Sequence, residues 1–147
     1  MLTNLHRIAA PLAFLCIAAF MASTLIAELL LSHASVAAVK QAIVTALLVL
    51  VPLLMITGGS GFALAKGRVA ARISAKQRRM PLIALNGLLV LVPLAVFLHL
   101  KAAQGAFDAL FYGAQVIELI AGAANLWLIG LNARDGLRLR SLSPAAA

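Results

Sequence analysis

The sequence predicts an all-α integral membrane protein: one domain over residues 1–147, folded as an antiparallel bundle of four transmembrane helices. Two observations predict this fold class. First, hydrophobic residues make up 64% of the chain and charged residues only 11%, whereas soluble domains have about 25% charged residues. Second, four apolar stretches approach or exceed the roughly 20 residues that cross a bilayer, at residues 8–31, 41–65, 81–98 and 107–131.

The first stretch is interpreted as a true span and not as a signal peptide. Small residues follow it at Ser32 and Ala34, as they would at a cleavage site. However, the apolar part of a signal peptide covers roughly 7–15 residues, and residues 8–31 exceed that length. The second stretch ends at a basic loop, residues 66–80, which the third stretch follows directly.

Charge predicts the orientation of the four spans. Positive residues near membrane spans remain on the cytoplasmic side. With four crossings, the N-terminus, the loop 66–80 and the tail 132–147 share one side, and they carry all but two of the 12 Lys and Arg residues. The exceptions are Lys40 and Lys101, in outer loops expected around residues 33–40 and 100–106. We therefore expect both termini inside, in a bacterial-type inner membrane.

The fourth span carries a polar face. Its polar or small residues recur mostly at three- or four-residue steps: Asp108, Tyr112, Gln115, Glu118, Gly122, Asn125 and Asn132. At 100° per residue they cover under half of the helix circumference. Polar groups are costly in hydrocarbon, so this face is expected to point into the bundle or toward a protein partner.

Glu118 is the most informative residue of this face. It lies roughly 18 Å below the outer end of its span at helical rise, where an isolated carboxylate is expected to be protonated. It can relay protons, bind a cationic substrate, or form a structural hydrogen bond with Asn86 or Thr57. Glu28 lies nearer the outer end of the first span, where it can reach the headgroups or pair with Lys40.

Two histidines are candidate haem ligands. His33 and His99 end the first and third spans on the same predicted side, whereas His6 lies on the other side. Two imidazoles from different helices can hold a haem iron, so a b-type haem between His33 and His99 is one alternative. The other is that both are ordinary residues at helix ends.

The sequence contains none of the constellations of a common enzyme site. It has no HExxH, CxxC, phosphate-binding glycine loop or nucleophile elbow, and its single Cys16 lies inside the first span. The basic loop lacks interleaved aromatic residues and its charge is explained by topology, so we expect no nucleic-acid partner.

Three functions follow as hypotheses. The first is a small non-enzymatic membrane subunit or accessory protein that binds a partner, a lipid or a quinone-like ligand. Its candidate site residues are Glu118, Gln115, Tyr112, Asn125, Asn86 and Glu28. The alternatives are a haem electron-transfer subunit using His33 and His99, and a proton-coupled small-molecule transporter using Glu118. Besides the bilayer, the expected partners are other membrane subunits or further copies of the chain.

Overall fold

The computed structural model describes residues 2–65 and 79–141, and these residues form helices joined by two short turns. Helix α1 spans Leu2–Leu30 and α2 spans His33–Ala65. A third helical rod covers Arg79–Ala103; it comprises residues 79–85, the π-helix η1 (Asn86–Leu91) and α4 (Val92–Ala103). Helix α5 spans Ala109–Ser141. Four helices are long and apolar enough to cross a membrane, which confirms the all-helical fold class.

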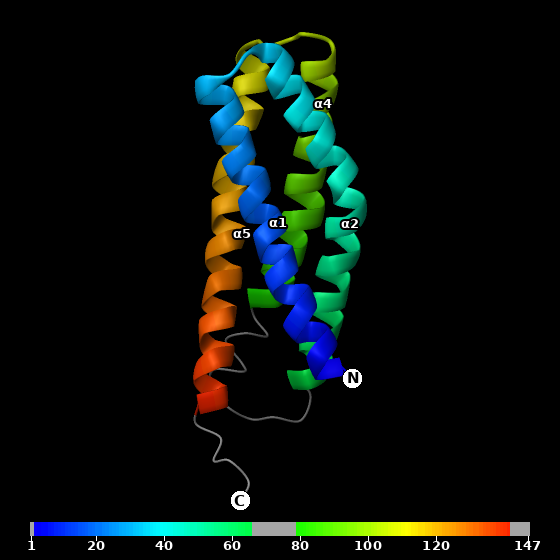
Figure 1. Ribbon diagram of the computed structural model, residues 1–147, viewed down its shortest axis with the longest axis vertical. Coiled ribbons are helices and arrows are strands. Elements are labelled where there is room, and N and C mark those ends of the chain that lie inside the picture. Colours follow the sequence, from blue (N-terminus) through cyan, green and yellow to red (C-terminus); the bar gives the residue numbers. More distant parts are fainter. Residues whose placement is uncertain (1, 66–78, 142–147) are drawn as a thin grey trace, which may run out of the picture.

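The four rods run antiparallel and form a closed ring (Figure 1). Helix α1 contacts α2 and α5, α2 contacts α4, and α5 contacts both η1 and α4. The two turns, residues 31–32 and 104–108, lie at one end of the bundle (Figure 1). Both chain ends lie at the opposite end. We refer to these as the turn end and the terminal end.

The helices extend beyond the apolar stretches, which corrects three expected boundaries. The loop expected at 33–40 is helical because α2 already begins at His33. The tail expected at 132–147 is helical as far as Ser141. Of the basic loop expected at 66–80, Arg79 and Met80 belong to the third rod, and residues 66–78 lie outside the described part of the chain.

Side-chain caps explain why the turns are so short. The Ser35 N–H donates to Ser32 Oγ at 3.4 Å, and the Val36 N–H donates to the Ser32 carbonyl at 3.0 Å. Serine is a favoured residue at this N-cap position. Asp108 caps α5 in the same way, because its Oδ1 accepts from the Phe111 N–H at 2.9 Å. In the second turn Gly105 has φ 68°, a conformation that glycine adopts without steric cost.

Large apolar side chains are exposed on the bundle, and several polar side chains are buried inside it. Large apolar side chains point outward, with Leu48 78% and Trp127 71% exposed. Polar side chains of α5 point inward, with Gln115 4% and Asn125 0% exposed. Soluble proteins show few large exposed apolar patches. In hydrocarbon, by contrast, polar side chains face the interior of a bundle.

Two apolar clusters hold the bundle together. At the turn end, the buried residues come from all four rods: Ala27, Val36, Leu98, Ala102, Phe111 and Ala114. Toward the terminal end, Ala13, Ile17 and Leu50 join α1 to α2, and Leu126 of α5 packs against them. The candidate site lies between these clusters.

The third rod contains a local widening. The Val92 N–H donates to the Gly87 carbonyl, five residues back, as in a π-helix. Pro93 follows directly and has no N–H to contribute to a regular helical ladder. The widened turn begins at Asn86, whose side chain reaches α5 as described below.

Candidate functional site

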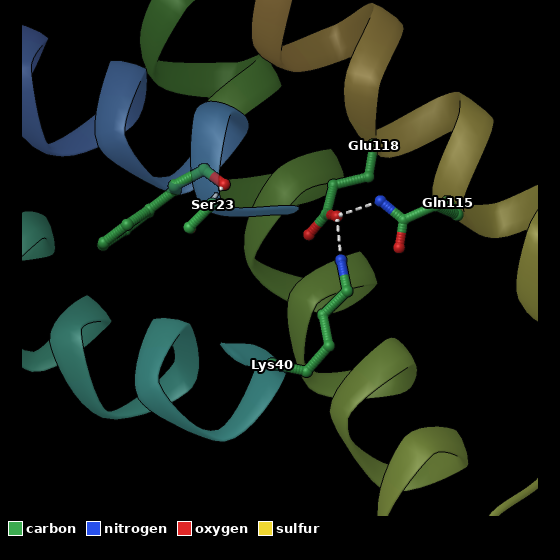
Figure 2. Close-up of polar contacts among 5 residues, drawn as sticks. Ser23, Lys40, Gln115 and Glu118 are labelled. Atoms are coloured by element: carbon green, nitrogen blue, oxygen red, sulfur yellow. Dashed lines mark hydrogen bonds and ion pairs between the residues drawn. The ribbon is translucent and has the colours of Figure 1, made fainter. Parts of the chain in front are cut away.

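A buried ion pair crosses the centre of the bundle. Lys40 Nζ of α2 donates to Glu118 Oε2 of α5 at 2.6 Å, and Gln115 Nε2 donates to the same oxygen at 3.2 Å (Figure 2). The side chains of Lys40 and Glu118 are 1% and 12% exposed. Helices α2 and α5 are not neighbours in the ring, and the long lysine side chain spans the distance between them.

Both partners lie well inside their helices. Lys40 lies seven residues after the start of α2, and Glu118 nine residues after the start of α5. At about 1.5 Å rise per residue, they lie about 10 and 14 Å from the turn end. These depths are a third to a half of a hydrocarbon core of about 30 Å.

Glu118 pairs with Lys40, which is not one of the partners that the sequence suggested. The sequence suggested Asn86 or Thr57 as its partner and placed Lys40 in an outer loop. In the structure, Asn86 bonds instead to Ala121 and Asn125, and the Thr57 carbonyl contacts His6 at the terminal end. Because an ammonium group lies beside Glu118, its carboxylate is not the isolated group for which protonation was expected.

Further polar groups surround the pair. Glu28 of α1 interacts electrostatically with Lys40, His33 and Glu118, and its Oε1 is buried without a hydrogen-bond partner among the described residues. Oε1 of Gln115 is likewise buried and unpartnered within the described chain. In Figure 2, Ser23 of α1 lies on the side of Glu118 opposite Gln115. The Ser23 hydroxyl donates to the Phe20 carbonyl at 3.0 Å.

A small cavity of about 60 Å³ adjoins the pair. All four rods line it: α1 contributes Thr24 and Met21, α2 contributes Leu47, the third rod Ala95, and α5 Glu118. Of the described residues that line it, Glu118 is the one ionisable residue, and the others are mainly apolar. A cavity needs only about 10–15 Å³ by this measure to hold a water molecule, so this one has room for a few waters or a very small ligand.

The energetics of such a pair favour a functional role over a purely stabilising one. Removing two charges from water costs several kcal/mol per ion, and apolar replacements of buried pairs are often neutral or stabilising. A buried pair is therefore a poor way to gain stability. Ionisable residues within membrane spans are expected to serve a functional role unless shown otherwise.

The remaining polar residues of α5 fall into two separate groups. Closer to the terminal end, Asn86 Nδ2 donates to the Ala121 carbonyl at 2.8 Å and to Asn125 Oδ1 at 2.9 Å. Asn125 Nδ2 in turn donates to the Ile83 carbonyl at 3.4 Å. These bonds join the third rod to α5 without contact to the ion pair, so we assign Asn86 and Asn125 to packing.

At the turn end, Asp108 and Tyr112 lie outside the ion-pair site. Asp108 Oδ2 accepts from Lys101 Nζ at 2.5 Å. This bond, together with the Phe111 N–H, lowers the pKa of Asp108 below its ordinary value. Tyr112 is 42% exposed and its hydroxyl lies 3.5 Å from His33 Nε2.

The two candidate haem ligands have different surroundings. His33 is the first residue of α2, whereas the sequence suggested that it ends the first span. Its ring stacks on the Phe107 ring, with the two centroids 4.1 Å apart. His99 Nδ1 is buried without a partner in the described residues. Neither this cavity nor the groove described below is lined by a histidine. A haem between His33 and His99 stays a prediction.

The sequence suggested that Lys40 lies in a loop, whereas the structure places it inside α2. The sequence does contain a signal for the earlier start of this helix. Ser32 is a favoured N-cap residue with a second serine, Ser35, three residues later. An N-cap at Ser32 starts the helix at His33 and places Lys40 two turns inside it. Apolar run length alone concealed this, because the charge of Lys40 interrupts the run.

Comparisons with known proteins give no family for this chain. A scan against protein-family models, a search of curated proteins and a search of solved structures each find no match. Function is therefore inferred from the geometry of the described residues.

Proposed function

We propose that the chain is a multi-pass protein of a bacterial-type inner membrane, with its terminal end in the cytoplasm. The four span-length helices and the outward apolar side chains support insertion. The orientation is supported by the basic residues, because Arg79 and Arg134 lie at the terminal end and the sequence between α2 and the third rod is basic. Positive residues of short loops remain cytoplasmic.

Within that membrane, we propose that the protein exchanges a small organic cation for a proton at Glu118. The observation that carries this proposal is Glu118, which is paired with the buried Lys40 and lies on the wall of a cavity lined by all four rods. A carboxylate at such a position binds one positive charge at a time: the Lys40 ammonium, a proton, or a cationic ligand. These three compete for the same oxygen.

Glu28 supplies a second position for the lysine. When a proton or a ligand cation occupies Glu118, the Lys40 ammonium loses its partner at 2.6 Å. Glu28 already interacts electrostatically with Lys40 and has a buried, unpartnered Oε1. Lys40 then pairs with Glu28, so no charge is left uncompensated in the bundle. One cation is exchanged for one proton, and the net charge of the site is unchanged.

The direction of the polar face favours this function over the binding of a partner helix. Gln115, Asn125 and Asn132 are buried inside the bundle, so a partner packed on the outside of α5 would not contact them. A ligand bound through this face must enter the bundle. An accessory role through other surfaces, such as lipid binding, remains compatible with the same fold.

The test uses purified protein reconstituted into proteoliposomes with an acidic interior. Radiolabelled guanidinium and tetramethylammonium are suitable probes because both are small and carry a permanent charge. We expect uptake driven by the proton gradient, accompanied by proton efflux. Uptake by the Glu118→Gln variant should fall to the level of empty liposomes, and Glu28→Gln should slow it.

Asp108→Asn serves as the matched control. It removes a carboxylate from the same helix, but at an exposed position outside the cavity. Its uptake should equal that of the wild type. Equal uptake by Glu118→Gln and wild type, or a wild-type protein that moves neither probe, would overturn the proposal.

A further inference from the structure

A second cavity of about 480 Å³ opens on the outside of the bundle between α1 and α5. We propose that this groove binds one acyl chain of an anionic phospholipid, whose phosphate is held by Arg134. The proposal depends on membrane insertion and is independent of cation exchange at Glu118.

The groove is apolar along its length and charged at one end. Phe14 and Met21 of α1 form one wall, and Leu126, Trp127 and Leu131 of α5 form the other. Its volume falls within the range of about 300–1,000 Å³ typical of ligand sites. Arg134 is the one charged side chain among the described residues of the lining.

The length of the groove matches one leaflet of a bilayer. On α5 its lining runs from Ala123 to Arg134, which is about 16 Å at helical rise. This is about half of a hydrocarbon core of roughly 30 Å. Arg134 lies next to the end of the apolar span Ala109–Asp135, at the level where lipid phosphates are expected.

The charge of Arg134 is available to a ligand. Asp135 is the nearby carboxylate, but Arg79 Nη1 already binds its Oδ2 at 2.8 Å. Arg134 Nε lies 3.8 Å from Asp135 Oδ1, and the Arg134 side chain is 56% exposed. Among the described side chains, the two guanidinium groups of Arg79 and Arg134 share the carboxylate of Asp135. A guanidinium binds phosphate through paired N–H donors.

Gly130 keeps the floor of the groove open. Gly130 lines the groove, and a Cβ atom at this position would meet nothing within 4 Å. We therefore expect a leucine side chain here to occupy part of the groove. Gly113 of the same helix is equally unobstructed and does not line the groove, which makes it a matched control position.

Trp127 provides a direct readout because it is the single tryptophan of the chain and lines the groove. The protein is reconstituted into phosphatidylcholine vesicles that contain a minor fraction of either brominated phosphatidylglycerol or brominated phosphatidylcholine. Bromine quenches Trp fluorescence on contact. We expect the apparent affinity for phosphatidylglycerol to exceed that for phosphatidylcholine by about fivefold. A basic residue at an anionic surface contributes about 1 kcal/mol, which corresponds to this ratio of affinities.

Three variants identify the site. Arg134→Gln should abolish the preference while leaving the quenching by phosphatidylcholine unchanged. Gly130→Leu should weaken quenching by both lipids, and Gly113→Leu should match the wild type. Equal quenching by the two lipids in the wild type would overturn the proposal, as would a preference that survives Arg134→Gln. Absence of quenching together with a dimer that Gly130→Leu dissociates would show that a second copy fills the groove.

Discussion

Lys40 and Glu118 carry opposite charges at a depth where neither charge is stable alone. The pair connects α2 and α5, which are not neighbours in the ring of helices. The consequence at the scale of single residues is that the two positions depend on each other. Removing Lys40 leaves the Glu118 carboxylate without its buried counter-ion, whereas removing Glu118 leaves Lys40 with Glu28 as a neighbouring carboxylate. Removing both leaves neither charge of the pair.

A double-mutant cycle measures this dependence. Lys40→Met should lower the free energy of unfolding by about 3–5 kcal/mol, the usual cost of breaking a buried pair. Glu118→Leu should lower it by less, because Glu28 offers Lys40 a second partner. The double variant should recover at least half of the loss caused by Lys40→Met, because it replaces the pair with apolar groups of similar length. Reversible unfolding of the protein in mixed micelles, followed by circular dichroism, provides the measurement.

Lys101→Met is the control for this cycle, since it removes a lysine that is ion-paired with Asp108 at the exposed turn end. It should have little effect on unfolding. Additive effects in the Lys40 and Glu118 cycle would show that the 2.6 Å contact contributes no coupling, and the site would lose its main support.

At the scale of elements, α5 depends on two different kinds of polar contact. Inside the bundle, Asn125 bonds to Asn86 and to the Ile83 carbonyl, and these bonds fix the axial position of α5 relative to the third rod. At its first turn, Asp108 caps the helix and pairs with Lys101. The two contacts respond to different perturbations.

Asn86→Ala removes both donors that reach α5, and Asn125 Oδ1 loses its partner. Interhelical hydrogen bonds in membrane proteins are worth about 0.6 kcal/mol on average and about 1.7 at most. We expect a loss of about 1 kcal/mol in the free energy of unfolding. Gln41→Ala removes only a bond to Thr45 on an exposed face of α2, so it should leave the free energy of unfolding unchanged. Equal effects of the two variants would contradict a stabilising role for the Asn86 bonds.

The turn end should respond to acid through Asp108. Its pKa is lowered by the Lys101 hydrogen bond and by the Phe111 N–H, so the folded state favours the ionised carboxylate. The contribution is fully present above the ordinary aspartate pKa of about 3.9 and is lost as the pH falls through the lower folded value. The protection of the Phe111 and Tyr112 amides against hydrogen exchange, measured relative to the intrinsic exchange rate at the same pH, should therefore fall at low pH in the wild type. In Asp108→Asn this protection should not change through the transition.

At the scale of the whole molecule, topology is the property that the other proposals depend on. Cysteines placed at Gln104 and at Ser74, in a Cys16→Ala background, report on the two ends. Ser74 lies in the basic segment 66–78, outside the described residues, and Gln104 lies in the turn before α5. A membrane-impermeant maleimide added to intact cells should label Gln104→Cys, and should label Ser74→Cys only after the membrane is permeabilised. Labelling of both in intact cells would refute a membrane crossing by the third rod, Arg79–Ala103, and with it the model of four spans.

The sequence was sufficient for the architecture and for part of the site. Four apolar runs predicted four helices, and the spacing of polar residues from Gln115 to Asn132 predicted a face that the structure buries. Hydropathy and helical periodicity are local properties of the chain, which is why they could be read in advance. Boundaries were less predictable, because capping by Ser32 and Asp108 extends helices past the apolar residues.

Only the tertiary structure shows which polar side chains contact one another across the bundle. Nothing in the local pattern pairs Lys40 with Glu118, which lie 78 residues apart; that contact depends on the relative height of α2 and α5 and on the reach of a lysine side chain. The groove between α1 and α5 likewise depends on how closely two helices distant in sequence approach. The sequence by itself determined which residues avoid lipid, because transfer energies belong to single side chains, whereas the fold determined which of them meet.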